Sequence, residues 1–432
     1  MKKHYVLFGS LLLFFLAISP ARAKDVYFIT INGAINPPVA GFIKESIEKT
    51  QEKGGEALII LLDTPGGLDT SMRDIVKNIM DASVPVIVYV YPSGARAASA
   101  GCIILLASHV AAMAPGTNVG AAHPVMIGSL SGGKEQQDKV MMKKVLQDAE
   151  AYSRSIAMKK GRNVEWAAKA VTQSVSITAQ DAFDKKVINV VANSPDELLA
   201  KIDGKTVETK AGQVTLKTRG TAQIEIPMSF KYKFLSYVSD PSVAYLLGML
   251  GLFGIFFELY SPGAIFPGVI GGISLILALY AFQTIPISFA GLALILLGII
   301  FFILELKIIS HGLLGIAGII SIVIGSVMLV NVPSSVLSIS WKSILAVAVA
   351  SGLFVFGVLT YVVKAQLSKV KTGREGLVGE TGIAKTDIIK KGKISVHGEL
   401  WNAKSDEPIR EGEEVIVTDV ERLVVKVKKK GG

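Results

Sequence analysis

Residues 57–67 read ALIILLDTPGG, and residues 85–101 read PVIVYVYPSGARAASAG. Each stretch begins as a continuous apolar run and stops at a turn rich in proline and glycine. Such runs are typical of strands that are buried on both faces of a parallel sheet. Helical periodicity at 38–51 and 71–80, and a small-residue stretch at 95–106, predict the intervening helices. The sequence therefore predicts an α/β domain with a largely parallel sheet.

The two turns carry residues that are suited to chemistry, because functional groups of α/β proteins gather at the carboxyl ends of strands. The first turn ends in Gly66 and Gly67, and paired glycines let a backbone N–H face a substrate oxygen. The second turn sets Ser99 among small residues at a predicted helix start, where a nucleophile is accessible. Each motif alone is also typical of an ordinary turn or of small core residues.

Two segments, one on either side of the α/β region, are much more apolar than the rest of the chain. Residues 1–23 have a charged start, an apolar stretch and an A-x-A-like site, as in a cleaved secretory signal peptide. Between residues 239 and 363 there are few charges, and the apolar runs approach or exceed the roughly 17–25 residues that span a bilayer. The sequence predicts a bundle of four to five transmembrane helices there. The five runs cover residues 243–260, 264–285, 289–304, 311–331 and 343–363.

Charge and cysteine content exclude several classes of protein. The net charge of +10 is divided among the signal segment and the two flanking regions, so neither flank has the basic surface of a nucleic-acid-binding protein. The single cysteine, Cys102, excludes an internal disulfide and every multi-cysteine metal site. Lys364, Lys369 and Lys371 follow the last apolar run, which favours the cytoplasmic side for the C-terminal region. Residues 24–238 are then extracytoplasmic if there are five spans.

Residues 376–430 alternate apolar and polar positions between regularly placed glycines, which predicts a small barrel of five short strands. Basic and acidic residues nearly balance in this region, and Trp401 is its only aromatic residue. An assembly or protein-interaction role therefore suits the barrel better than nucleic-acid binding.

In their order and spacing, the two turns of the α/β region resemble the ClpP/crotonase superfold. The run AMAPGTNVGA at 112–121 and the helical stretch from Lys144 to Asn163 resemble, more closely, the membrane-bound serine proteases of the NfeD family, which are related to signal peptide peptidase A. The run GELWNA at 398–403 resembles the OB-fold domain that ends NfeD proteins. The resemblance covers the whole mature chain. It implies a ClpP-like serine protease domain at 24–238, a transmembrane bundle at 239–363 and an OB-fold domain at 364–432.

The resemblance also implies the roles of individual residues. Ser99 is expected to be the nucleophile, and Lys144, within KVLQDAEAY, its general base. Lysine is a base only when it is neutral, and burial among apolar groups disfavours its charged form. The backbone N–H groups of Gly67 and Ala100 are expected to form the oxyanion hole. His123 is the rival base and would instead make a Ser-His-Asp triad.

The family implies a membrane-anchored serine endopeptidase that cleaves hydrophobic peptide segments, including those of a stomatin-like membrane partner. We expect a homo-oligomer in the bacterial inner membrane, with the active site near a subunit boundary and without metal or other cofactor. One alternative is a non-catalytic scaffold that organises stomatin-like proteins. Another, acyl-CoA chemistry on the crotonase fold, is disfavoured by secretion because CoA substrates are cytoplasmic.

One departure from the family is Lys186, where a glycine usually forms a left-handed turn.

Overall fold

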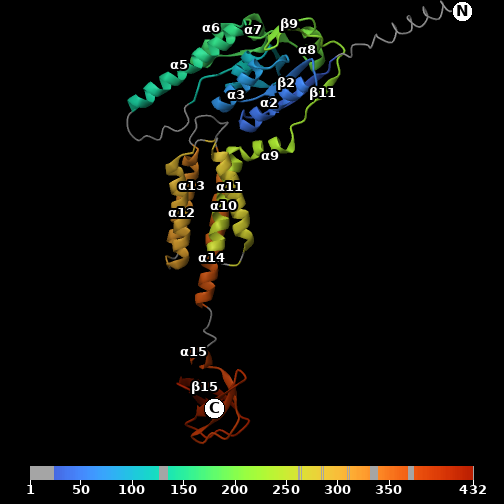
Figure 1. Ribbon diagram of the computed structural model, residues 1–432. Coiled ribbons are helices and arrows are strands. Elements are labelled where there is room, and N and C mark those ends of the chain that lie inside the picture. Colours follow the sequence, from blue (N-terminus) through green and yellow to red (C-terminus); the bar gives the residue numbers. More distant parts are fainter. Residues whose placement is uncertain are drawn as a thin grey trace, which may run out of the picture. The chain divides into compact units, whose positions relative to one another are not determined.

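The computed structural model forms two compact units, residues 1–352 and 353–432, and each is considered by itself (Figure 1). The signal peptide predicted at 1–23 lies outside the residues that the structure describes. The described residues are 24–125, 135–260, 263, 265–283, 285, 287–308, 310, 312–330, 339–367 and 374–431.

A six-stranded sheet forms the centre of the N-terminal domain, in the order β11-β1-β2-β3-β5-β8. All neighbouring strands in it are parallel, which confirms the predicted α/β class. The strands are β1 (Val26–Asn32), β2 (Ala57–Asp63), β3 (Val86–Val90), β5 (Val110–Met113), β8 (Val190–Val191) and β11 (Gln223–Glu225).

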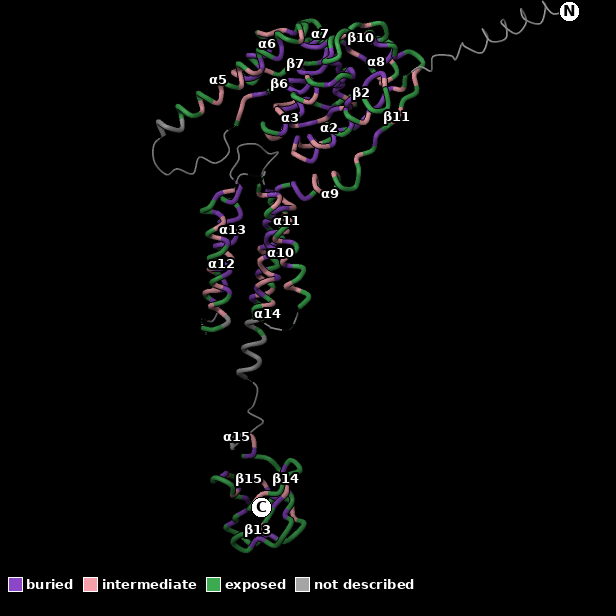
Figure 2. The backbone as a smooth tube through the Cα atoms, in the orientation of Figure 1, coloured by how far each residue is buried: buried purple, intermediate pink, exposed green. Residues whose placement is uncertain are grey.

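The central strands are apolar throughout because both faces of the sheet are covered. Side chains alternate across a strand, so Ile29 and Ile60 enter one hydrophobic core, whereas Phe28 and Ile59 enter a second core on the opposite face. Figure 2 shows the buried backbone that is concentrated in the centre of this domain. The domain contains α2 (Pro37–Glu52), α3 (Asp69–Met80), α4 (Ala100–Ala107), α5 (Glu135–Lys159), α6 (Val164–Thr172), α7 (Ala179–Asp184) and α8 (Pro195–Ile202).

The helix predicted over 95–106 begins later than expected. Residues Arg96–Ala98 form a short strand, β4, and α4 starts only at Ala100. The strand pairs with β6 (Asn118–Gly120), which pairs in turn with β7 (Ser176–Thr178). Strand pairing satisfies the backbone groups that a helix would otherwise use. Small residues were the only sequence signal, and they fit either structure.

The turn at Lys186 keeps the left-handed conformation for which the family uses glycine. Lys186 has a φ of 58°, and the next N–H, of Val187, donates to the carbonyl of Ala182 over 2.8 Å. A left-handed backbone costs a residue with a Cβ about 1–2 kcal/mol. The buried guanidinium of Arg162 stabilises the turn, because it donates to the carbonyls of Val187 at 3.0 Å and Ser108 at 2.9 Å.

A β-hairpin and a short helix complete the first water-facing domain. Strands β9 (Thr206–Thr209) and β10 (Gly212–Thr215) form the hairpin. Helix α9 (Phe230–Val238) packs against α2, where Ser236 accepts a hydrogen bond of 3.1 Å from the Asn36 amide.

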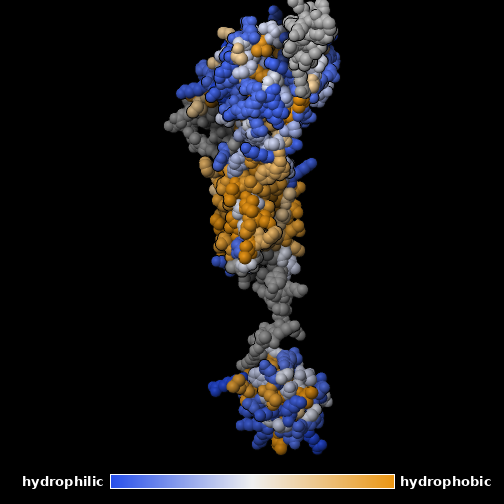
Figure 3. Space-filling model, turned by 45° about the vertical axis from the view of Figure 1, so that its right-hand side comes forward, coloured by the Kyte–Doolittle hydropathy of each residue, from blue (hydrophilic) through white to orange (hydrophobic). Residues whose placement is uncertain are grey.

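Five apolar helices follow, close to the five predicted runs. Helices α10 and α11 are long and apolar enough to cross a membrane, and α12, α13 and α14 contribute shorter apolar stretches. Figure 3 shows hydrophobic side chains over the surface of this region, as expected for helices that face lipid tails. The bounds are α10 (Pro241–Tyr260), α11 (Ile265–Phe282), α12 (Phe289–Lys307), α13 (Leu313–Leu329) and α14 (Trp341–Leu367).

Glycines let these helices pack as two hairpins, α10 with α11 and α12 with α13. A Cβ added to Gly271 would lie 2.9 Å from the Cα of Gly254, and one added to Gly298 would lie 2.8 Å from the carbonyl oxygen of Gly318. Small residues at such contacts let helix backbones approach closely in a membrane. Glu305, near the end of α12, accepts hydrogen bonds from the N–H groups of Gly312 and Gly315 at the start of α13.

The C-terminal unit contains the predicted barrel of five strands, closed in the order β12-β13-β14-β16-β15. Alternate side chains such as Ile394, Val396, Val415 and Val417 fill its interior. A short helix, α15 (Arg374–Leu377), precedes it. The strands are β12 (Thr381–Ala384), β13 (Lys391–Val396), β14 (Glu399–Lys404), β15 (Glu414–Glu421) and β16 (Val424–Lys429).

The adjacent glycines Gly271 and Gly272 provide a matched test of the first hairpin. We expect Gly271→Val to destabilise the full-length chain by about 1–3 kcal/mol, because the new side chain meets the backbone of α10. Gly272→Val should change stability by less than about 0.5 kcal/mol, because no atom lies within 4 Å of a Cβ there. Thermal unfolding in detergent measures both. Equal melting temperatures for the two variants would contradict the hairpin contact.

Candidate active site

A cleft of about 850 Å³ opens beside the carboxyl ends of β2 and β4. Its lining comes from the turns after these strands, from α3, α4 and α5, and from residues 121–125. All the residues that the sequence singled out for catalysis line this cleft. They are Ser99, Lys144, Gly67, Ala100 and His123.

The turns after β2 and β4 are joined by a parallel bridge between Thr64 and Ala97. The N–H of Thr64 donates to the carbonyl of Arg96 over 2.7 Å, and the N–H of Ala98 donates to the carbonyl of Thr64 over 3.1 Å. The carboxylate of Asp63 accepts a further bond of 3.0 Å from the N–H of Arg96. Since Thr64 and Ala97 are fully buried, the two backbone bonds of Thr64 fix the turn after β2 against β4 away from water, whereas the Asp63 bond is exposed.

Ser99 lies between β4 and α4 in a conformation that serine rarely adopts. Its φ is 51°, and its N–H donates to the carbonyl of Gly120 over 3.0 Å. Strain of this kind costs about 1–3 kcal/mol and persists only where the surroundings enforce it. Gly66 packs directly against this residue, since a Cβ there would lie 2.7 Å from the Ser99 Cβ. The half-buried Ser99 side chain is thereby held at the first turn of α4.

Two backbone N–H groups in the cleft are available for a substrate oxygen. The β-bridge between Gly67 and Ile35 is formed by the neighbours of Gly67. The N–H of Ile35 donates to the carbonyl of Gly66, and the N–H of Leu68 donates to the carbonyl of Ile35. Ala100 is the first residue of α4, where an N–H has no partner within the helix. Among the described residues, the turn, loop and cap hydrogen bonds include none that either N–H donates. Such donors can stabilise a developing oxyanion.

Lys144 reaches the cleft from α5 but is exposed in the single chain. The second half of α5 packs on the domain through Ala149 and Tyr152, whereas its N-terminal end extends beyond the rest of the domain (Figure 1). Val140 and Met141, one turn before Lys144, are 54% and 53% exposed. A lysine that acts as a base is expected to be covered by apolar groups, and the residues that the structure describes leave Lys144 exposed.

Arg73 of α3 contacts α5 close to Lys144. This residue was not predicted from the sequence. Its guanidinium contacts the carboxylates of Asp69 at 2.8 Å and Asp148 at 2.5 Å, and lies 4.3 Å from the ring centroid of Tyr152. Asp148 is one helical turn after Lys144, and Asp69 is one turn before Arg73. A spacing of four residues places each pair on one face of its own helix, but it does not predict that α3 and α5 are in contact.

His123, the rival base, also lines the cleft and is half-buried. Its Nδ1 lies 2.9 Å from the carbonyl oxygen of Val171. If Nδ1 carries the proton, this bond leaves Nε2 as an acceptor, as a base requires. In the described part of the chain, no carboxylate is hydrogen-bonded to the ring. The third member of a Ser-His-Asp triad is therefore absent from those residues.

Cys102 does not line the cleft. Cys102 is buried in α4, and burial raises the pKa of its thiol to about 12, so it is a packing residue with little thiolate at neutral pH. Across the described ranges, no cluster of three or more His, Cys, Asp or Glu side chains is arranged to hold a metal ion.

A serine in a strained strand-to-helix turn, unpaired N–H donors and a lysine in one cleft, joined to apolar helices, define a membrane-bound serine hydrolase by class. Three family models match the chain in succession. They are the NfeD1b N-terminal domain over residues 25–211, the NfeD integral membrane domain over 242–361, and the NfeD-like C-terminal, partner-binding domain over 374–429.

Known proteins resemble the chain over nearly its whole length. Membrane-bound protease PH1510 of Pyrococcus horikoshii is 37% identical over 442 residues, covering 99% of each chain. Membrane protein NfeD1b of Bacillus subtilis is 25% identical and covers 94% of this chain and 93% of its own. A solved lysine-to-alanine mutant of the 1510-N membrane-bound stomatin-specific protease, in complex with a substrate peptide, is 36% identical, with a TM-score of 0.46 over 50% of this chain and 98% of its own.

The chain therefore belongs to the NfeD family of membrane-bound serine proteases. The predicted class of enzyme and the predicted order of α/β protease domain, membrane region and β-barrel are confirmed.

The contacts of Arg73 predict that this residue positions the helix that carries Lys144. We expect Arg73→Ala to raise amide hydrogen exchange about fivefold in residues 144–152, since partly exposed ion pairs and a cation–π contact contribute about 1 kcal/mol. Lys77→Ala, one turn further along α3 and exposed, is the matched control and should leave exchange unchanged. Unaltered exchange in Arg73→Ala would show that α5 is held by its apolar contacts alone.

Proposed function

We propose that the cleft hydrolyses peptide bonds with Ser99 as nucleophile and Lys144 as general base. The observation that carries this proposal is that both side chains line one cleft together with the N–H groups of Gly67 and Ala100. Nucleophile, base and oxyanion donors are the groups that acyl transfer requires.

In the first step, the neutral amine of Lys144 takes the proton of the Ser99 hydroxyl as its Oγ attacks the substrate carbonyl. The carbonyl oxygen becomes an oxyanion, which the N–H groups of Gly67 and Ala100 stabilise. Collapse of this intermediate breaks the C–N bond, and the Lys144 ammonium returns its proton to the leaving amine. The products are an acyl ester on Ser99 and a free amine.

In the second step, water replaces the released amine. Lys144, neutral again, takes a proton from the water as it attacks the ester carbonyl, and the same two N–H groups hold the oxyanion. The ester bond breaks, and the proton on Lys144 passes to Ser99 Oγ. No cofactor or metal enters this cycle.

The mechanism needs the exposed Lys144 to be covered, because water stabilises the ammonium form. Val140 and Met141 form an exposed apolar surface one turn away on the same helix. We propose that the working enzyme is a homo-oligomer in which a neighbouring copy covers this part of α5, and that bound substrate completes the cover.

The substrate class follows from the cleft lining, which includes the apolar side chains of Met72, Ile103, Val125 and Val145. We propose hydrophobic peptide segments as substrates, and a stomatin-like membrane protein as their source. The archaeal domain that is 36% identical carries the description stomatin-specific, and the C-terminal family model is described as partner-binding.

We also propose that the protein lies in the bacterial inner membrane with its protease domain outside the cytoplasm. Five apolar helices separate the two water-facing domains, and an odd number of spans puts the chain's ends on opposite sides. The basic residues that follow the last helix favour the cytoplasmic side for the barrel.

Three substitutions in the full-length chain test the catalytic assignment. Ser99→Ala and Lys144→Ala should each lower the rate of cleavage of an apolar peptide by about a thousandfold or more, because each removes a member of the proposed dyad. His123→Ala should retain most of the activity. Lys143→Ala is the matched control, since this neighbouring lysine is exposed and has no assigned role.

Two outcomes would overturn the assignment. If Lys144→Ala stays active while His123→Ala is inactive, then His123 is the base. If the wild-type chain cleaves none of a range of apolar peptides and membrane-protein segments, then this protein organises its partner without cleaving it.

The proposed topology predicts the side of each fusion point. A phosphatase that is active only outside the cytoplasm should be inactive when it is fused after Lys430 and active when the chain is cut and fused after Val238. A fluorescent protein that matures only in the cytoplasm should give the reverse pattern. Phosphatase activity after Lys430 would mean an even number of spans.

A further inference from the structure

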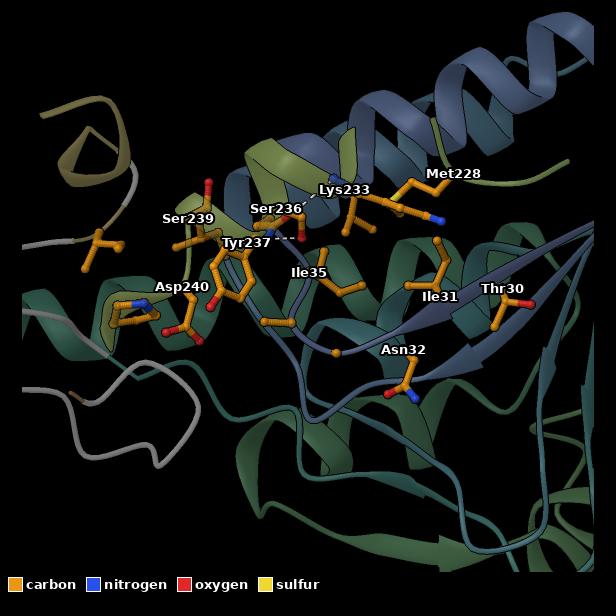
Figure 4. A pocket seen from close by; sticks show the side chains of 17 residues that line it. Thr30, Ile31, Asn32, Ile35, Met228, Lys233, Ser236, Tyr237, Ser239 and Asp240 are labelled. Carbon is orange, nitrogen blue, oxygen red and sulfur yellow. Dashed lines mark hydrogen bonds between the residues drawn. The ribbon is translucent and has the colours of Figure 1, made fainter. Parts of the chain in front are cut away.

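A second hollow of about 490 Å³ lies next to the Ser99 cleft and has no role in the mechanism above. Figure 4 shows its two sides. Ile31, Asn32 and Ile35, from β1 and the loop that follows it, form one side, and Lys233 and Tyr237 of α9 belong to the other. Its volume is within the roughly 300–1,000 Å³ of pockets that enclose small ligands.

The hollow and the cleft meet at one backbone pairing. Leu68 lines both cavities, while Gly67 lines only the cleft and Ile35 only the hollow. Ile35 is paired with this segment by two hydrogen bonds, from its N–H to the carbonyl of Gly66 over 2.8 Å and to its carbonyl from the N–H of Leu68 over 2.9 Å. The two cavities are therefore adjacent, and they are separated by the paired backbone of Ile35 and residues 66–68.

The lining of the hollow suits apolar side chains more than a small ion. Ile31, Ile35 and Val39 are buried in its wall. The two charged residues at its rim, Lys233 and Asp240, have opposite signs, so neither an anion nor a cation finds a cluster of matching charge. Both charged side chains are exposed, and the apolar side chains of the wall are buried, as in sites that hold a hydrophobic segment.

The membrane end of the hollow indicates where its occupant comes from. Pro241, the first residue of α10, also lines it, as does Ile285 beyond α11. The hollow therefore borders the point at which the chain enters its apolar helices. A peptide whose flanking sequence remains in the membrane can reach Ser99 along this path.

We propose that this hollow is a second substrate subsite, which binds apolar side chains of an extended peptide beyond those held in the Ser99 cleft. The proposal rests on the proposed protease function and adds the route by which a membrane-derived segment is bound. A subsite of this kind makes cleavage depend on peptide length, because each further apolar side chain that is buried there strengthens binding.

The experiment compares three apolar peptides with the full-length enzyme: a short core sequence, and the same core extended with apolar residues at either end. We expect kcat/KM for one extended peptide to exceed that for the core by about tenfold. Ala34→Trp, which fills the hollow, should reduce this ratio to about one. Ala211→Trp, at an exposed turn outside both cavities, should keep the wild-type ratio.

A second variant and a binding measurement keep the test decisive. Tyr237 is 69% exposed, so Tyr237→Ser removes part of one wall without disturbing the core and should also lower the ratio if Ala34→Trp fails to fold. Fluorescence anisotropy of the same peptides on the Ser99→Ala chain should show the same preference for length. If the chain binds the longer peptide more tightly but cleaves none of the peptides, the protease proposal alone is wrong. If the wild-type ratio of kcat/KM values is one, or if both variants keep the wild-type ratio, the subsite proposal is wrong.

Discussion

The buried bridge between Thr64 and Ala97 is the constraint on which the site depends. It joins the turn that presents the Gly67 N–H to β4, the strand directly before Ser99, through backbone bonds of 2.7 and 3.1 Å. Because the bridge lies out of water, neither turn can move without leaving polar groups unpaired. The rigid connection makes the left-handed backbone of Ser99 tolerable. It also explains Gly66, since a side chain there would collide with Ser99. A side chain at Gly67 would instead collide with the backbone of Ile35.

The sequence predicts the elements of this site better than their contacts. Continuous apolar strands, glycine turns and five apolar runs have few structural solutions, and each was found where expected. The start of α4 was misplaced because residues 96–98 are small enough for helix or strand, and the choice is made by distant residues at 118–120. Arg73 was missed for a related reason. Its partners Asp148 and Tyr152 lie on another helix, and one sequence does not say which helices meet.

The exposure of Lys144 could not be predicted from the sequence for another reason. Periodicity and family resemblance identify the helix and the residue, but burial depends on everything that packs against it. Leu146, Ala149 and Tyr152 anchor the later turns of α5 to the core, whereas Val140 and Met141, one turn before Lys144, are more than half exposed in the described structure. The proposed nucleophile, Ser99, and the proposed oxyanion donors, Gly67 and Ala100, belong to segments that are fixed within the domain. The proposed base, Lys144, belongs to an exposed turn of α5, so under this proposal catalysis depends on assembly.

The closed barrel at the other end of the chain limits how it can engage a partner. Since β12 pairs with both β13 and β15, each strand within residues 381–429 has a neighbour on both sides, and no backbone edge remains to be extended. Contacts there have to use projecting side chains, and Ile389, Leu400 and Leu423 are 77%, 67% and 74% exposed. Side-chain contacts of this kind suit a partner that keeps its own fold, whereas peptide hydrolysis requires a strand pulled free of structure. The two water-facing domains thus offer different kinds of contact: projecting side chains on a closed barrel, and a cleft that contains Ser99.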